Sequence, residues 1–155
     1  MNKDTFLISD AQVKDIPYLV KLLNQLFSIE QDFTADCERQ EAGLKLLIQN
    51  ANNACIKVAK TQENVVIGMV SAQLTISTAE GGYSVWVEDM IVDKAYRARG
   101  IGQALLTASL QWAKEKGATR AQLLVDLDNE PALGYYDHLG WKSSRMGMRR
   151  MMLKD

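Results

Sequence analysis

The sequence predicts an α/β (α+β) fold in a single domain that spans residues 1–155. Strand and helix patterns are mixed along the chain, and three strands in its middle follow one another as an antiparallel meander. A glycine-rich turn then leads directly into a long amphipathic helix. A chain of 155 residues is long enough to bury one core and too short for two of ordinary size.

The first third of the chain predicts one strand and two helices. Residues 5–8 form a short apolar strand. Asp15 then stands where it can cap a helix, and Pro17 falls in the first turn of that helix, where a missing N–H costs nothing. A second helix is expected over residues 36–49, where apolar residues recur at helical spacing.

The meander occupies the middle of the chain. Its three strands are expected at residues 54–59, 65–77 and 83–92, and short polar turns separate them. Because the turns are too short for a crossover, neighbouring strands should pair antiparallel. The polar segment "KTQEN" forms the first of these turns, and "AEGG" forms the second.

The last third begins with the long helix, expected over roughly residues 100–116. Apolar residues recur through it at helical spacing, and lysines followed by Gly117 form a conventional helix end. A buried strand is then expected at residues 121–127 and a short helix at residues 131–139. The chain closes with the apolar segment "RMGMRRMML".

Composition excludes several classes of function. Lys and Arg number 18 against 19 acidic residues, so the net charge of −1 provides no overall field for nucleic acid or an anionic membrane. Two cysteines without CxxC spacing and a single histidine argue against a zinc site. The apolar stretch at the start is too short for export or for spanning a bilayer. These features indicate a cytoplasmic protein with two idle thiols.

The glycine-rich turn lies in the stretch "AYRARGIGQALL", residues 95–106. The first N–H groups of a helix have no internal partner, and the helix dipole adds positive potential, so this arrangement suits a phosphate. The P-loop pattern GxxxxGK is absent, and a dinucleotide fingerprint would require glycine where Leu105 stands. With Arg97 and Arg99 beside the glycines, we expect a diphosphate ligand; glycines that serve only packing are the plainer alternative.

Two motifs in the second half resemble a known family. Arg97, Gly100 and Gly102 fill the pattern Q/R-x-x-G-x-G/A, and "LDNEPALGYYDHLGW" matches a second pattern further along the chain. Its matching residues are Asn129, Ala132, Tyr135, Tyr136, Gly140 and Trp141. Both stretches resemble the GNAT superfamily of N-acetyltransferases, which use acetyl-CoA. The order of elements fits along nearly the whole chain, and the likeness is weakest across residues 15–50.

The resemblance implies a mixed central sheet flanked by helices, with the meander before the CoA-binding loop and a final strand at the end. It also implies that a bulge splays the strand before the loop from its parallel neighbour. The co-substrate would be acetyl-CoA, with no metal. The residues expected to bind it are Met90, Ile91, Val92, Arg97, Ala98, Arg99, Gly100, Ile101, Gly102, Gln103, Ala104, Asn129 and Tyr136.

Acetyl transfer to an amine requires removal of a proton, because an alkyl ammonium has a pKa near ~10. Glu88 is the first candidate for this base, through water, and Asp89 is the alternative. Strand alternation puts their side chains on opposite faces unless the bulge changes that, and a solvated carboxylate is the plainer interpretation. Tyr136 is the expected acid for the thiolate, and Tyr135 should pack inward. No enzyme nucleophile is needed.

The acceptor is expected to be a primary amine on a small molecule or a peptide. An acidic run lies where it would enter, and a solvated helix face explains this run equally well; its residues are Glu30, Asp32, Asp36, Glu38 and Glu41. Trp86 and Tyr83 could line the same pocket. The methionine-rich C-terminal segment would provide a homodimer edge. A non-catalytic acyl-CoA sensor of the same fold is the alternative function, and nucleic-acid binding ranks far behind.

Overall fold

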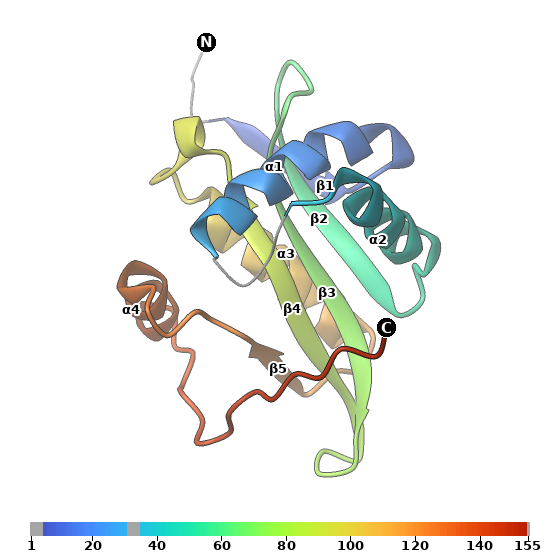
Figure 1. Cartoon of the computed structure of the whole chain (residues 1–155), viewed down its shortest axis with the longest axis vertical. Helices are drawn as coiled ribbons and strands as arrows, with labels where there is room; N and C mark the ends of the chain where they lie inside the picture. The colour runs from blue at the N-terminus through green and yellow to red at the C-terminus, as the bar shows by residue number, and fades with distance from the viewer. Residues whose placement is uncertain (1–4, 31–34, 155) are drawn as a thin grey trace. The chain divides into compact units, whose positions relative to one another are not determined.

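The computed structural model describes residues 5–30 and 35–154, which form two compact units divided after Leu124. The first unit contains a mixed five-stranded sheet in the order β1-β2-β3-β4-β5 (Figure 1). The first four strands are antiparallel, and β5 runs parallel to β4. Their bounds are β1 Phe6–Asp10, β2 Ala54–Thr61, β3 Val66–Ser77, β4 Gly82–Val92 and β5 Arg120–Leu123. The predicted α/β class, with its meander, is confirmed.

Helices cover both faces of this sheet, as Figure 1 shows. The helices of the first unit are α1 Ile16–Ile29, α2 Cys37–Gln49 and α3 Ile101–Glu115, with short 3-10 turns η1 Val13–Asp15 and η2 Lys94–Tyr96. Helices α1 and α2 pack on the face that carries Ile56, Val58 and Met69. Helix α3 packs on the opposite face, against Cys55 and Ala72. Neighbouring residues of β2 thus point to different layers, as strand alternation requires.

Helix α3 approaches the sheet closely at Gly68 of β3. A Cβ at this position would lie 3.0 Å from Cδ1 of Leu105, a fully buried side chain. It would also lie 3.4 Å from the carbonyl oxygen of Ile91. The absence of a side chain therefore lets α3 lie directly on the strands that lead to its own N-terminus.

The starts of α1 and α2 differ in how they are capped. Asp36, at the expected start of the second helix, caps α2, because its Oδ1 accepts the N–H of Arg39 at 3.2 Å. Asp15 lies at the predicted start of α1, but its side chain does not cap that helix. It accepts the N–H of Gln12 at 2.8 Å and pairs with Lys60 at 3.0 Å. The reason is that η1 precedes α1 without a break, so the free N–H groups lie one turn earlier.

The second unit contains one helix, α4 Glu130–His138, and none of its described residues is fully buried. Residues 141–154 form no strand, so the predicted final strand is wrong for the described chain. An alternating apolar pattern becomes a strand only when another strand accepts its hydrogen bonds, and here no described strand does so. The predicted strand at residues 121–127 also ends early, at Leu123. In the part of the chain that is described, no helix is long and apolar enough to cross a bilayer.

Candidate active site

The glycine-rich turn forms the N-terminus of α3. Ala98 and Gly100 both have left-handed backbone, with φ of 62° and 78°, so the chain turns sharply before the helix begins. The N–H of Ala104 donates to the carbonyl oxygen of Gly100, which makes it the first amide with an acceptor inside the helix. The N–H groups of residues 101–103 precede it and have no acceptor within the helix. This end of α3 therefore has the amides and the dipole that bind an anion.

Both arginines of the turn are held against the segment that precedes it. Nε of Arg97 donates to the carbonyl oxygen of Val92 at 3.0 Å. The guanidinium of Arg99 lies 5.3 Å from the ring centroid of Tyr96, and its Nη2 donates to the carbonyl oxygen of Ala95 at 3.5 Å. These contacts fix two positive charges beside the same turn, as an anion site requires.

The predicted bulge is present in β4. Met69 pairs with Ile91 and Ser71 pairs with Glu88, so the single residue Val70 on β3 lies opposite two residues on β4. One of those two is Asp89, whose φ of 52° is left-handed. A bulge of this kind bends the strand and strengthens its twist.

The pairing of β4 with its parallel neighbour ends just before the bulge. The two strands pair only from Ser84 to Val87, opposite Arg120 to Leu123. Residues 88–92 of β4 have no strand partner on this side among the described residues. The backbone groups of this free edge lie immediately before the turn that leads to α3, where an extended ligand can pair with them.

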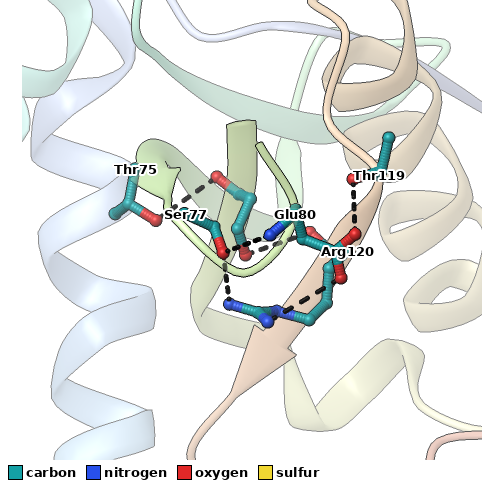
Figure 2. Close-up of polar contacts among 6 residues, drawn as sticks. Thr75, Ser77, Glu80, Thr119 and Arg120 are labelled. Atoms are coloured by element: carbon teal, nitrogen blue, oxygen red, sulfur yellow. Dashed lines mark hydrogen bonds and ion pairs between the residues drawn. The ribbon is translucent and has the colours of Figure 1, made fainter. Parts of the chain in front are cut away.

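Polar contacts fix the end of the sheet at which β4 and β5 are paired (Figure 2). Arg120 at the start of β5 donates to Oγ of Ser77 at 3.2 Å and lies 3.8 Å from the carboxylate of Glu80. Thr119 donates to the same carboxylate at 3.1 Å, and Ser84 donates to the carbonyl oxygen of Arg120 at 3.2 Å. These bonds attach β5 to the turn between β3 and β4.

The bulge brings two carboxylates to one face of the sheet. Glu88 is exposed and shares its face with Ser71, its partner across the sheet. Oγ of Ser71 donates to the carbonyl oxygen of Glu88 at 3.1 Å, and the half-buried carboxyl of Asp89 also lies within reach of this hydroxyl. The predicted separation onto opposite faces is therefore removed, as the bulge allows. Burial, and then the negative charge of Glu88, raise the pKa of Asp89 to about 6, and the hydroxyl of Ser71 opposes both.

Trp86 lies on the same face as Glu88, two residues earlier on β4, and pairs with Gln73 of β3. Tyr83 is an odd number of residues away, so it lies on the opposite face with Val85. The prediction that Trp86 and Tyr83 line one pocket is therefore wrong. Of the acidic run, Asp36 serves as a helix cap and pairs with Arg39 at 3.4 Å, and Asp32 lies outside the described residues.

The second unit carries the other predicted site residues. Oδ1 of Asn129 accepts the N–H of Ala132 at 3.2 Å, so this side chain caps α4. The ring of Tyr136 lies edge-on to those of Tyr135 and Trp141, and the distances between ring centroids are 5.5 Å and 6.0 Å. Tyr135 is half-buried, as is Tyr136, and burial raises the pKa of the Tyr135 hydroxyl. The roles of Asn129 and Tyr136 toward the co-substrate stay predictions.

Two residues of the first unit were missed by sequence reasoning. Ser71 lies beneath both carboxylates only because of the register between β3 and β4. Gln25 of α1 bonds to Asp93 and Lys94, which lie 68 and 69 residues away in the chain. No local pattern marks either residue, because each acquires its partner through tertiary structure.

Comparisons with known proteins agree with this geometry. The model of the acetyltransferase (GNAT) family matches residues 21–141. A mycothiol acetyltransferase of Corynebacterium aurimucosum is 52% identical over 46 residues, which cover 30% of this chain and 15% of that protein. A glucosamine 6-phosphate N-acetyltransferase of Trypanosoma brucei brucei is 29% identical over 85 residues, which cover 54% of this chain and 56% of that protein.

Among solved structures, the glucosamine-6-phosphate N-acetyltransferase from Arabidopsis thaliana matches with a TM-score of 0.76. It is 18% identical, and the match covers 95% of this chain and 98% of that one. At 18% identity, this likeness is evidence for the fold alone. The matches to the two curated relatives span less than two thirds of their length, 15% and 56%.

Proposed function

Because the chain belongs to the acetyltransferase (GNAT) family, we propose that it is an enzyme that moves the acetyl group of acetyl-CoA directly to a primary amine. One observation carries the proposal. The free edge of β4 at residues 88–92 runs straight into the left-handed turn and the N-terminus of α3. A ligand with an amide-bearing arm and a diphosphate needs these two features in this order.

The residues proposed to hold acetyl-CoA follow from that order. Residues 90–92 pair with the extended arm through their backbone groups. The amides of residues 97–103, with the guanidinium groups of Arg97 and Arg99, hold the diphosphate; the amide of Ala104, also expected to take part, is instead bonded to Gly100. Asn129 is proposed to contact the arm. The N–H of Met90 donates to the thioester oxygen and stabilises negative charge there as it develops.

Glu88 is proposed to remove the proton of the acceptor amine through a water molecule. It is exposed, and Asp89 lies beside it on the same face. Asp89 is the alternative base, because a carboxyl with a pKa of about 6 is ionised at neutral pH and is better matched to accept a proton. Tyr136 is proposed to protonate the departing thiolate. Direct transfer in a ternary complex then needs no covalent enzyme intermediate.

The proposed acceptor is a cationic primary amine, on a small molecule or a peptide. Two carboxylates and the half-buried ring of Trp86 gather on one face of β4, next to the amide of Gln73. Carboxylates attract an ammonium group, and an indole face adds a cation–π contact. Both cysteines are free thiols, Cys37 exposed and Cys55 buried, which suits the reducing cytoplasm proposed as its compartment.

An acceptor screen tests the proposal. Purified protein is incubated with acetyl-CoA and a panel of amines, and release of the free thiol is followed. The panel contains amino sugars, polyamines and lysine-containing peptides, each with its hydroxyl analogue as a control. Amine-dependent thiol release supports the enzyme. Binding of acetyl-CoA without any such release would support the alternative, a non-catalytic acyl-CoA sensor.

A further inference from the structure

A ring of hydrogen bonds joins α1 to residues 93 and 94, which directly precede the proposed diphosphate loop, residues 97–103. Nε2 of Gln25 donates to Oδ2 of Asp93 at 3.2 Å, and the N–H of Lys94 donates to Oε1 of the same glutamine at 3.2 Å. The side-chain amide of Gln25 thus donates to the carboxylate of Asp93 and accepts from the backbone N–H of the next residue, Lys94. Gln25 is half-buried on a helix whose neighbouring leucines Leu22 and Leu26 are buried in the core.

The residues that Gln25 contacts form the junction between β4 and the loop. Oδ1 of Asp93 accepts the N–H of Ala95 at 2.9 Å, and the N–H of Asp93 donates to the carbonyl oxygen of Ile67 at 2.8 Å. Asp93 therefore caps η2 with one carboxylate oxygen and accepts from Gln25 with the other. The free N–H groups at the start of η2 are satisfied by these two side chains.

The same junction holds the two arginines of the loop. Arg97 donates to the carbonyl oxygen of Val92, and Arg99 donates to that of Ala95, so both anchors flank Asp93 and Lys94. A shift of the junction would move both guanidinium groups and the turn that follows. Preorganised donors cost nothing to order when the ligand arrives, whereas a loose loop must be ordered at the expense of affinity.

We propose that Gln25 is a positioning residue for acetyl-CoA, which fixes the diphosphate loop from α1 through Asp93 and Lys94. The inference rests on the proposed function. It assigns a role in co-substrate binding to a residue that lies far before the loop in the sequence, and it requires no contact between Gln25 and the ligand itself.

Reciprocal substitutions test the ring. Gln25→Glu keeps an acceptor for Lys94 but replaces the donor to Asp93 with a second negative charge. Asp93→Asn places an NH₂ group opposite that of Gln25. Each single change should weaken binding of CoA about tenfold, the typical value of one hydrogen bond to a charged group.

The double variant, Gln25→Glu with Asp93→Asn, restores the ring with donor and acceptor exchanged. The new side-chain amide at position 93 donates to the new carboxylate at position 25, which still accepts from the N–H of Lys94. Affinity for CoA should therefore return to within about threefold of wild type.

Titration calorimetry with CoA measures these affinities, and thermal unfolding shows that each variant is folded. Gln111→Glu is the matched control, because Gln111 makes an exposed helix contact with Glu115 at 3.3 Å and should leave CoA binding unchanged. In turnover assays, Gln25→Glu should raise KM for acetyl-CoA and leave kcat at saturation unchanged. A general loss of folding would lower both affinity and stability and would not be reversed by the second substitution.

Three results would overturn the inference. The first is that both single variants bind CoA with wild-type affinity. The second is that the double variant binds CoA no more tightly than the weaker-binding single variant. The third is that Gln25→Glu leaves KM for acetyl-CoA unchanged. If Gln25→Glu fails to fold, Asp93→Asn and the double variant still decide, because only the ring predicts that the double variant binds better. Wild-type protein that binds no CoA would overturn the proposed function as well, so the two failures are distinct.

Discussion

Asp89 combines three features that are each uncommon for an aspartate. Its backbone is left-handed, its carboxyl is half-buried, and its pKa is raised to about 6. A left-handed conformation costs free energy for a residue with a Cβ, although Asp and Asn tolerate it best. Such strain tends to persist at functional sites, and here it lies within the free edge of β4, next to the proposed base Glu88. The nearby hydroxyl of Ser71 lowers the pKa of Asp89 and so opposes part of the effect of burial.

Asp89→Asn should stabilise the protein at neutral pH. Burial favours the protonated carboxyl, so the stability that Asp89 contributes is full below pH 3.8 and is lost as the pH rises through about 6. Asparagine keeps the left-handed backbone and never ionises. We expect the free energy of unfolding to rise by about 3 kcal/mol at pH 7.5 and to change little at pH 3.5. Urea titrations at both pH values check this, and a loss of stability at pH 7.5 would contradict it.

Tyr136→Phe should lower kcat by tenfold or more and leave CoA affinity nearly intact, because only the acid is removed. The ring contacts with Tyr135 and Trp141 survive the change, so the helix should stay folded. Steady-state kinetics and calorimetry separate the two quantities. Tyr135→Phe is the matched control and should keep kcat close to wild type; equal effects of the two substitutions would remove Tyr136 from its role.

At the scale of elements, the site depends on how β4 ends and α3 begins. Polar contacts of Arg120 fix β5 to the turn between β3 and β4, and the pairing of the two parallel strands ends at Val87, just before the bulge. Gly68 lets α3 lie against the strands close to where its own N-terminus forms. The positive end of the helix dipole is thereby held beside the free strand edge, with the arginines of the loop next to it.

Gly102→Asp should separate ligand binding from stability. Residue 102 lies in the first turn of α3, where a negative side chain normally stabilises a helix. The same charge would repel a diphosphate, so we expect CoA affinity to fall at least tenfold while the unfolding temperature holds or rises. Gly102→Asn, which has the same size and no charge, should lose much less affinity. Unchanged CoA affinity in the aspartate variant would contradict a diphosphate at this turn.

At the scale of the whole molecule, apolar side chains of the C-terminal segment stand out. Met146, Met151 and Leu153 are 86%, 83% and 96% exposed. Large exposed apolar side chains in one short segment favour association. We expect a homodimer in solution and expect Met151→Lys combined with Leu153→Lys to weaken it. Sedimentation velocity measures both, and a wild-type protein that remains monomeric at every accessible concentration would refute the prediction.

The single domain predicted from chain length stays a prediction, because the described residues form two compact units. The second unit has no buried residue of its own among those described, and a segment without a core cannot offset its conformational entropy. One cooperative unfolding transition for the whole chain would support a single domain. Two separate transitions would contradict it.

The sequence by itself determined most of the elements, the final strand excepted, and the glycine-rich turn before α3. Strand alternation, helical spacing and the glycines of residues 100 and 102 are local properties, and the mixed sheet with its meander followed from them. Only the tertiary structure decided which side chains meet. The bulge that turns Asp89 toward Ser71, the face that separates Trp86 from Tyr83 and the bonds of Gln25 to the loop all depend on register or on distant partners. A sequence pattern fixes which face a residue prefers, but a hydrogen bond needs two groups within about 3 Å, and folding alone brings distant groups that close.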